Sequence, residues 1–321
     1  MRYFVTGGAG FIGSNYVEHL FDNVKDVTGV TIYDKFTYAA NPKNFQDFLG
    51  DPRLSVIKGD ICDSVLLQKS MAGHDYVVHF AAESHVDRSI DDASAFVHTN
   101  VLGTFNVLEA SRRVGIKTVI HVSTDEVYGS LKEGSADETF PLEPNSPYAA
   151  SKAASDLLAR SYFVTHGLDV RITRCCNNYG KHQYPEKVIP VFIRKLMSGK
   201  KLPIYGDGRN VREWIHVNDH VRGIQVVLEK GTCGEIYNIG SGFHLSNNDL
   251  ASAIIVAMGL KEDMKSWVND RRGHDFRYSV DSSKIKQLGF QAIINLDEGL
   301  QENVNWYIAN LGWWDFDSEV K

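Results

Sequence analysis

A tyrosine and a lysine stand four residues apart at the start of a helix-like segment, in Tyr148-Ala-Ala-Ser-Lys152. Positions i and i+4 share one face of a helix, so the phenol and the ammonium point the same way. A free tyrosine has a pKa near ~10 and is a poor base at neutral pH, but a neighbouring cation favours the phenolate and lowers that value. This spacing alone is common by chance, and it becomes a strong signal in combination with a glycine-rich turn and with Thr124 at a strand end.

Two adjacent carboxyl groups, Asp125 and Glu126, come directly after an expected strand at Thr118–Ser123 and the following Thr124. Side chains alternate along a strand, so both carboxyls reach one ligand only if the strand ends near Ser123 or Thr124. Two carboxyls this close separate their pKa values, and we expect Glu126 to help keep Asp125 protonated. The pair is suited to hold one protonated and one ionised carboxyl, and the competing interpretation is a solvated acidic loop.

A glycine-rich turn at 7–13 lies between the first expected strand, Tyr3–Thr6, and a helix-like segment. Glycines let backbone N–H groups approach a pyrophosphate at a helix N-terminus. Asp34 comes 21 residues after Gly13, at the end of a second expected strand, where a carboxylate accepts hydrogen bonds from an adenosine ribose. This order predicts a dinucleotide site that includes Gly7, Gly10, Phe11, Ile12, Gly13 and Asp34.

At this site NAD is favoured over NADP, because Asp34 would repel a 2′-phosphate. Lys35 argues the other way, since it is the kind of residue that an NADP enzyme uses. Farther along, Gly59-Asp60-Ile61 ends another strand and either meets the adenine edge or is an ordinary turn. A bound nicotinamide ring would add its positive charge to that of Lys152 in lowering the pKa of Tyr148.

Short β-branched runs alternate with helical patterns over the first half of the 321-residue chain. Strands separated by helices indicate βαβ units, and runs that are apolar throughout indicate a parallel sheet covered on both faces. We therefore predict an α/β fold, a Rossmann-type doubly wound parallel sheet with a smaller C-terminal α/β substrate-binding lobe. The expected strands are Tyr3–Thr6, Val30–Tyr33, Leu54–Lys58, Tyr76–Phe80, Thr118–Ser123 and Val170–Thr173, and the helices between them are Ile12–Phe21, Ser64–Met71, Asn100–Val114 and Tyr148–His166.

The regular alternation stops after Cys175, where Pro, Gly, Asn and basic residues become frequent between Asn177 and Gly208. The later expected elements are the helices Asp219–Lys230, Asn248–Met258 and Leu296–Ala309 and the strand Ile236–Ile239. We predict a dinucleotide-binding domain at 1–175, with a return of the chain near 211–240, and a second lobe at 176–321.

Charge and composition argue against several classes of protein. The net charge of -6 is untypical of a nucleic-acid-binding protein. The sequence has no run of 18 or more apolar residues and no basic-then-apolar leader, so we expect neither a membrane span nor a signal peptide. The 4 cysteines lack C-x-x-C spacing and the 12 histidines form no H-x-x-H or H-E-x-x-H motif, so we expect free thiols in the cytoplasm and no metal site.

The motifs around Thr6–Gly13, Thr124, Tyr148 and Lys152 together resemble the extended short-chain dehydrogenase/reductase family. Within that family, residues 123–129 (Ser-Thr-Asp-Glu-Val-Tyr-Gly) are similar to the dTDP-glucose 4,6-dehydratases, and the likeness covers nearly the whole chain. Further segments that carry it are 34–39, 81–89, 177–180, 185–187, 202–208, 212–214 and 270–275.

The resemblance implies dehydration of a nucleotide-linked sugar, dTDP-glucose, with NAD as a recycled cofactor. Oxidation at C4 makes the C5 proton removable, water then leaves across C5 and C6, and the hydride returns to C6, so there is no net oxidation. By resemblance, Glu126 is the base at C5 and Asp125 the acid at C6. Tyr148 is the base that takes the C4 hydroxyl proton while NAD accepts the hydride from C4. Lys152 would hold the nicotinamide ribose, and Thr124 would bond a sugar hydroxyl.

The resemblance also implies further ligand contacts, each of which is otherwise an ordinary loop or surface residue. Arg212 and Arg271 would clamp the diphosphate, since guanidinium forks match phosphate oxygens. Tyr205 would stack on the base. The other expected cofactor contacts are Lys35, Thr37, Asp60, Ile61, Ala82 and Ser84, and the other expected substrate contacts are Ser84, His85, Thr124, Asn177, Lys187, Pro203, Asn247 and His274.

Two positions depart from the family pattern, which often has a proline where Lys181 stands and an aromatic residue or Gln near His182. This loop borders the substrate entrance, so UDP instead of dTDP as the carrier stays open. A 4-epimerase or a sugar-acid decarboxylase of the same fold is the nearest rival, but epimerases carry small residues where Asp125 and Glu126 lie. A redox sensor that holds NAD without catalysis would lack the tyrosine or the lysine.

The expected helices Asn100–Val114 and Tyr148–His166 carry apolar stripes beyond what one sheet face needs. In the family the corresponding pair forms a four-helix bundle across a two-fold axis. We therefore predict a homodimer, with a nucleotide sugar as the ligand and neither nucleic acid nor a membrane as a partner.

Overall fold

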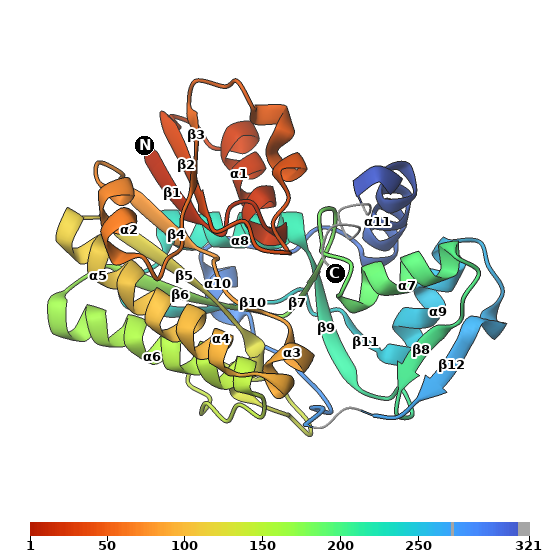
Figure 1. Ribbon diagram of the computed structural model, residues 1–321. Coiled ribbons are helices and arrows are strands. Elements are labelled where there is room, and N and C mark those ends of the chain that lie inside the picture. Colours follow the sequence, from red (N-terminus) through yellow and green to blue (C-terminus); the bar gives the residue numbers. More distant parts are fainter. Residues whose placement is uncertain (271–272, 314–321) are drawn as a thin grey trace.

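The computed structural model describes residues 1–270 and 273–313. Figure 1 shows a large sheet flanked by helices, beside a smaller part built mainly from the last third of the chain. Arg271, one of the predicted diphosphate contacts, lies outside the described residues. Among the residues that are described, no helix is long and apolar enough to cross a membrane.

The large sheet has seven parallel strands in the order β10-β6-β5-β4-β1-β2-β3. Strands β2 and β3 lie on one side of β1, and the later strands lie on the other side. In such sheets a ligand binds outside the carboxyl ends of the strands, at the point where the strand order reverses. The predicted doubly wound parallel sheet is confirmed. Its strands are β1 (Arg2–Thr6), β2 (Gly29–Asp34), β3 (Leu54–Lys58), β4 (Tyr76–His79), β5 (Thr118–Thr124), β6 (Val170–Cys175) and β10 (Ile236–Ile239).

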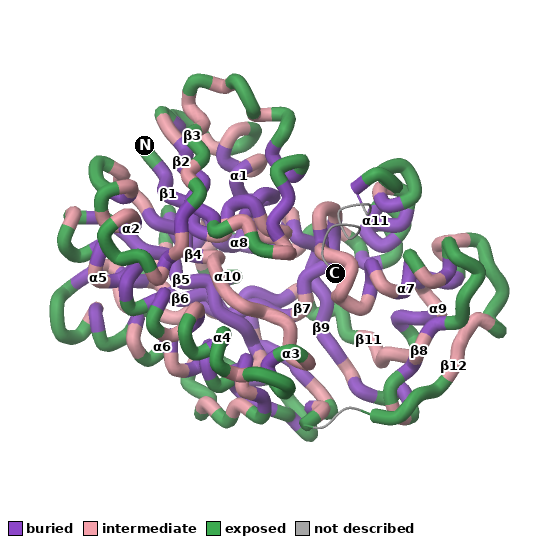
Figure 2. The backbone as a smooth tube through the Cα atoms, viewed as in Figure 1, coloured by how far each residue is buried: buried purple, intermediate pink, exposed green. Residues whose placement is uncertain are grey.

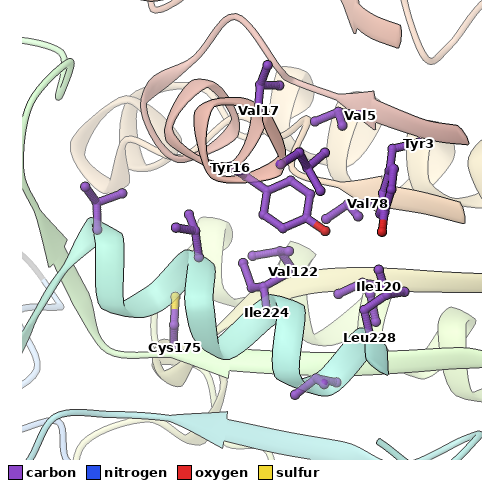
Figure 3. Packing of buried hydrophobic residues seen from close by; sticks show 14 of the residues in the cluster. Tyr3, Val5, Tyr16, Val17, Val78, Ile120, Val122, Cys175, Ile224 and Leu228 are labelled. Carbon is purple, nitrogen blue, oxygen red and sulfur yellow. The ribbon is translucent and has the colours of Figure 1, made fainter. Parts of the chain in front are cut away.

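Helices cover both faces of this sheet, which is why central strands such as β5 are buried along their whole length. One face carries α1 (Phe11–Asn23) and α8 (Val217–Lys230), and Figure 3 shows the ring of Tyr16 of α1 on the side that faces Ile224 of α8. The other face carries α2 (Ser64–Met71), α5 (Thr104–Val114) and α6 (Pro147–His166). Figure 2 shows the buried backbone concentrated along the strands between these layers.

Local sequence sets the start of α6, the helix that carries the tyrosine and the lysine. The Ser146 side chain accepts a hydrogen bond from the N–H of Ala149, and Pro147 occupies the first helical position, where its missing N–H needs no partner. The helix ends at Gly167, which has a φ of 68°. Tyr148 therefore lies in the first turn, at the end of the helix nearest the carboxyl ends of the strands.

One predicted helix is not uniform. The range Asn100–Val114 was expected to be a single helix, but Val97–Gly103 is a π-helix and only Thr104–Val114 is α-helical. Within the π-helical turn, Asn100 is buried and bonds the loop after β4, as described below. Widened turns of this kind frequently occur at functional sites. The short helices α3 (Val86–Asp91) and α4 (Ser94–Phe96) precede it.

The smaller part contains a three-stranded sheet, β11-β9-β7, and a two-stranded sheet, β12-β8. The region 177–208 was expected to be irregular, but it contains a helix, α7. Pro190 falls in the first turn of α7, where backbone N–H groups have no intrahelical acceptor, so the proline does not break the helix. The elements are β7 (Asn177–Tyr179), α7 (Val188–Met197), β8 (Leu202–Tyr205), β9 (Val211–His216), β11 (His244–Ser246), α9 (Asn247–Ala257), β12 (Lys265–Val268) and α11 (Leu296–Ala309). The helix α10 (Ser283–Gln287) instead belongs to the larger part, where Ile285 joins its core.

The chain crosses between the two parts more than once. After β9, which pairs with β7 and β11, it returns to the larger part as α8 and β10. It then forms α9 and α11, which contribute to the apolar core of the smaller part. The predicted boundaries at residues 175 and 176 stay a prediction, because the two parts are interleaved along the sequence.

Candidate active site

A cleft of about 350 Å³ opens at the carboxyl ends of the strands. Residues of both parts line it, from the turn after β1 to the loop that precedes α7. Every residue predicted to contact the cofactor lies in its wall: Gly7, Gly10, Phe11, Ile12, Gly13, Asp34, Lys35, Thr37, Asp60, Ile61, Ala82, Ser84, Tyr148 and Lys152.

The turn after β1 accepts only glycine at two positions. Gly7 has a φ of 69°, and a Cβ on it would lie 2.7 Å from the N of Ala81. A Cβ on Gly13 would lie 2.2 Å from the carbonyl oxygen of Gly7. The turn is therefore packed against its own backbone, and it leads directly into α1, whose first residues line the cleft. Backbone N–H groups at this helix start fit a pyrophosphate.

Asp34 ends β2 with its carboxylate held in place by the backbone. Its two oxygens accept hydrogen bonds from the N–H of Ala9, at 3.0 Å, and of Phe36, at 2.9 Å. Burial raises the pKa of Asp34, and these two bonds oppose that rise. The Lys35 ammonium lies 2.7 Å from the carboxylate of Asp60. Its charge is thus paired within the protein, which removes the main argument for a 2′-phosphate.

The condition set for the two adjacent carboxyls is met. Strand β5 ends at Thr124, and Asp125–Tyr128 form a 3₁₀ turn directly after it. The N–H of Glu126 donates to the hydroxyl of Thr124, at 3.3 Å, which closes the turn. Because the strand has ended, side-chain alternation no longer separates Asp125 from Glu126, and both line the cleft.

The surroundings of Asp125 favour its protonated form. The side chain is buried, and burial raises the pKa of Asp125 well above its ordinary value. The neighbouring Glu126 is the next cause, followed by Glu213, while Arg212 acts in the opposite direction. The predicted direction for Asp125 is confirmed, although desolvation contributes more than the neighbouring carboxyl does. The raised pKa favours the protonated form, from which this group can donate a proton.

Tyr148 and Lys152 are both buried in the wall of the cleft, and Lys152 Nζ donates to the carbonyl of Val122 at 2.8 Å. Burial lowers the pKa of Lys152 to about 8. Burial also raises the pKa of Tyr148 well above its ordinary value, with Glu126 as the next cause and a hydrogen bond with Thr124 opposing it. The expectation that Lys152 and a bound nicotinamide ring together lower the pKa of Tyr148 stays a prediction for the cofactor-bound protein, in which they must oppose the effect of burial.

Several residues in the cleft wall or directly behind it were not singled out as site residues in the sequence analysis. Asn100 donates to the carbonyl of Glu83, at 3.0 Å, and to the hydroxyl of Ser151, at 2.9 Å. It accepts from the N–H of Glu83 at 2.9 Å, so it fixes the loop after β4 against the catalytic helix. An asparagine inside a helical pattern was the available signal. Other lining residues missed in this way are Cys175, Cys176, Asn178, Gln183, Tyr184, Glu186 and Trp214.

The predicted substrate contacts divide into two groups. Ser84, Thr124, Asn177 and Lys187 line the cleft. Among the described residues, the others lie outside its lining: His85, Pro203, Tyr205, Arg212, Asn247 and His274.

The substrate contacts outside the cleft lining bond to protein groups. Arg212 is buried and donates to the carbonyls of Asp275 and Phe276, and its guanidinium lies 4.3 Å from the ring centre of Tyr278. The ring of His274 lies 2.6 Å from a carboxylate oxygen of Asp270. Asn247 begins α9 and donates its N–H to the carbonyl of Asn210. We expect these groups to meet a ligand only where it extends beyond the cleft.

No group of three or more His, Cys, Asp or Glu side chains that could hold a metal ion occurs within residues 1–270 and 273–313. The arrangement in the cleft is instead suited to proton transfer next to a dinucleotide. A buried acid, a half-buried carboxylate and a tyrosine–lysine pair face the same cavity as the glycine turn. Fold and site together define a short-chain dehydrogenase/reductase with an additional acid–base pair.

Comparison with known proteins agrees with this class. The profile of the family described as GDP-mannose 4,6 dehydratase matches residues 4–303. The dTDP-glucose 4,6-dehydratase of Streptomyces griseus is 54% identical over 314 residues, which cover 97% of this chain and 95% of the relative. The chain therefore belongs to the nucleotide-sugar 4,6-dehydratases of the extended short-chain dehydrogenase/reductase family, and the predicted resemblance is confirmed.

Solved structures are similar over the same length. The crystal structure of DesIV, the dTDP-glucose 4,6-dehydratase of Streptomyces venezuelae with NAD and TYD bound, matches with a TM-score of 0.96 and 52% identity, covering 98% of this chain and 99% of that one. A UDP-glucose 4-epimerase of Thermotoga maritima with UDP-glucose matches with a TM-score of 0.90 but only 29% identity, covering 97% and 100%. The fold is thus shared across both activities, and the side chains in the cleft must decide between them.

Proposed function

We propose that this protein is an NAD-dependent dTDP-glucose 4,6-dehydratase, which converts dTDP-glucose to dTDP-4-keto-6-deoxyglucose and water. The observation that carries the proposal is the buried Asp125 beside Glu126 in the same cleft as Tyr148 and Lys152. A 4-epimerase needs a tyrosine base but no acid–base pair at C5 and C6. A buried carboxyl with a raised pKa, beside a second carboxyl at the end of β5, fits a reaction in which a proton leaves carbon and water departs.

The first step needs a base at the C4 hydroxyl, and Tyr148 is placed to take that proton. Bound NAD would supply the hydride acceptor at C4 and return the hydride to C6. Lys152 is a cation next to Tyr148 on the same helical face, so it stabilises the phenolate once the proton has moved. Thr124 hydrogen-bonds with Tyr148 and so orients the phenol. The glycine turn and Asp34 would hold the pyrophosphate and the adenosine ribose.

Elimination follows at the neighbouring carbons. A ketone at C4 acidifies the C5 proton, which Glu126 removes, while Asp125 gives its proton to the departing C6 oxygen. The high pKa of Asp125 suits this role, because a carboxyl that is ionised at neutral pH could not donate. The burial that keeps Asp125 protonated also keeps bulk water away from the reacting atoms.

The test is incubation of the purified protein with dTDP-[4-²H]glucose without added NAD, followed by NMR of the product. Deuterium at C6 of a 4-keto-6-deoxy sugar is the expected result. Unchanged substrate in the presence of added NAD would reject the dTDP-sugar proposal, and UDP-[4-²H]glucose is the next substrate to test. A 4-epimer with deuterium retained at C4 would instead identify an epimerase.

We also propose that the protein is a homodimer. A second, apolar hollow of about 710 Å³ lies over the helices that the sequence analysis singled out, lined by Ser94, Val97, His98, Val101, Leu102, Phe105 and Leu158. Val97 is 56% exposed and Phe105 41% exposed in the single chain, which is unusual for large apolar side chains gathered in one patch. A sedimentation mass of a single 35.9 kDa chain at micromolar concentration would contradict the proposal.

A cytoplasmic location is proposed on the chemistry of the cysteines. All four, Cys62, Cys175, Cys176 and Cys233, are free thiols, and no pair is joined as a disulfide. Free thiols persist in reducing compartments. Fractionation of cells that make the protein would test this, and recovery outside the cytoplasm would reject it.

A further inference from the structure

The loop between β7 and α7 crosses the cofactor end of the cleft. We call residues 181–187 the strap. Gln183, Tyr184, Glu186 and Lys187 of the strap line the same cavity as the glycine turn and the first residues of α1. The strap comes from the smaller part of the molecule, whereas the glycine turn belongs to the larger part, so the strap spans the two.

The first end of the strap is fixed to α1. Lys181 Nζ lies 2.6 Å from a carboxylate oxygen of Glu18, and the Lys181 carbonyl accepts from Asn15 at 3.2 Å. The Nδ1 atom of His182 lies 3.2 Å from the hydroxyl of Ser14. All three contacts fall on the first turns of the helix whose start faces the cleft. Lys181 and His182 are also the two departures from the family pattern, and here they make these contacts.

The second end is fixed to helix α3 and to the loop that follows β4. The Glu186 carboxylate lies 3.0 Å from the Arg88 guanidinium, which also lies 3.9 Å from the ring centre of Tyr38. Lys187 Nζ donates to the carbonyl of Ser84 at 2.6 Å. The strap is therefore attached to the larger part on both sides of the cleft.

The middle of the strap is held by the smaller part. The Gln183 carbonyl accepts from the hydroxyl of Tyr307 at 2.6 Å, and the Gln183 side chain donates to the carbonyl of Asn178 at 2.9 Å. The ring of His182 meets the edge of Trp306, with ring centres 5.3 Å apart. The middle of the strap is thus held by α11. The strap can move away from the cleft only if the contacts at one of its two ends break.

We propose that the strap retains bound NAD, and that NAD leaves only when the contacts of Lys181 with Glu18 or of Arg88 with Glu186 break. The inference rests on the proposed function, because it presumes that NAD occupies the cleft. The proposed reaction returns its hydride in every cycle, so the cofactor has no need to leave between turnovers. A closed strap then slows NAD release without slowing the chemistry.

The test measures the dissociation rate of radiolabelled NAD from the pre-loaded protein after mixing with excess unlabelled NAD. We expect release to be about two- to fivefold faster for Lys181→Ala and for Arg88→Ala, because each ion pair is partly exposed. The double variant should show roughly the sum of the two increases, because the opening of either end lets NAD leave. Turnover of Lys181→Ala with saturating NAD should change less than about twofold.

The matched control is Lys25→Ala, which removes one exposed positive charge beyond the other end of α1 and should leave release unchanged. The charge exchange Glu18→Lys with Lys181→Glu serves as a second test. Each single change should speed release, and their combination should slow it again.

A double variant Lys181→Ala/Arg88→Ala that releases NAD at the rate of the unaltered protein would overturn the proposal. So would a charge exchange that stays as fast as its single changes. A protein that binds no NAD at all would count against the proposed function instead, so the two failures are distinguishable. If the double variant melts at a lower temperature, the charge exchange decides, because it preserves the number and kinds of charged groups.

Discussion

The cofactor side and the nucleotide side of this cleft are built in different ways. On the cofactor side, the groups stand at the ends of strands of one parallel sheet, with the glycine turn after β1, Asp34 at the end of β2 and Thr124 at the end of β5. On the nucleotide side, the predicted contacts come from β8, β9 and the start of α9. Several of them already bond to protein groups, as Arg212 does with the carbonyl of Asp275.

The difference shows what each kind of scaffold can guarantee. A parallel sheet brings the carboxyl ends of its strands to one edge, so residues placed there meet whatever the loops do. Side chains on two small sheets meet a ligand only if long connections bring them there. The chemistry of the protein is therefore located in its most regular part, and the recognition of the nucleotide depends on its least regular part. The following predictions test this contrast.

The largest effect is expected from Tyr148→Phe, on the regular side. Without the phenol, no group takes the C4 hydroxyl proton, and kcat should fall by about 10³-fold. Steady-state formation of the 4-keto product measures it. Tyr162→Phe is the matched control, because this tyrosine lies on the same helix but its hydroxyl donates to Glu109, away from the cleft. A loss below about tenfold for Tyr148→Phe would mean that another group is the base.

The second prediction concerns Asp125→Asn. The amide cannot donate a proton to the departing oxygen, so kcat should fall by about 10²-fold. Oxidation at C4 does not use this group, so absorbance of the reduced nicotinamide should build up on mixing with substrate. Stopped-flow absorbance distinguishes this from the loss of Tyr148, for which no reduced nicotinamide should form.

The same substitution should also make the protein more stable at neutral pH. The folded-state pKa of Asp125 is raised, so the folded state binds more protons than the unfolded state once the pH exceeds the ordinary value of 3.8. Stability contributed by this group is therefore lost as pH rises through that window, and asparagine removes the loss. Denaturant unfolding at several pH values measures it, with Asp91→Asn at the exposed end of α3 as the control. If the stability of Asp125→Asn and of the unaltered protein depends on pH in the same way, the assignment of a raised pKa to Asp125 is contradicted.

The third prediction concerns α8, which connects the two sides. His220 on this helix is fully buried, and within the described residues neither of its ring nitrogens has a hydrogen-bond partner. Burial lowers the pKa of His220 from its ordinary value of 6.5 to about 3. The unfolded chain therefore binds a proton that the folded protein does not, and stability falls as pH drops below 6.5.

His220→Leu removes this contribution. Between pH 8 and pH 5 the free energy of unfolding should fall by about 2 kcal/mol less in the variant than in the unaltered protein. Chemical denaturation at the two pH values measures the difference, and His166→Leu on the exposed end of α6 is the control. If the free energy of unfolding falls by the same amount between the two pH values in His220→Leu and in the unaltered protein, His220 has a hydrogen-bond partner or water in solution.

The smallest effect is expected on the irregular side, from Arg212→Lys. An ammonium cannot reproduce the fork that donates to the carbonyls of Asp275 and Phe276. If Arg212 positions the nucleotide end of the substrate, KM should rise by about tenfold while kcat changes by less than about twofold. Arg209→Lys is the control, since Arg209 is an exposed residue paired with Asp207. A fall in kcat with unchanged KM would place Arg212 with the catalytic groups instead.

Local sequence decides where the strands of this fold end and where its helices start. The β-branched run at Leu54–Lys58 and the helical pattern at Ser64–Met71 match β3 and α2 residue for residue. The helix α7 was missed, because Pro190 reads as a breaker unless its place in the first turn is known. The π-helical turn Val97–Gly103 was missed because a residue pattern with helical period does not specify which carbonyl each N–H will bond.

By itself, the sequence determined the fold class and the dinucleotide turn, because both depend on spacing along the chain. It predicted the roles of the acid–base side chains only through resemblance to a family. Only the tertiary structure decided that burial, and not Lys152, governs the pKa of Tyr148. It also decided that Lys35 is paired with Asp60 and that the strap spans the cleft. These properties depend on desolvation and on contacts between residues far apart in the chain, which spacing along the sequence does not encode.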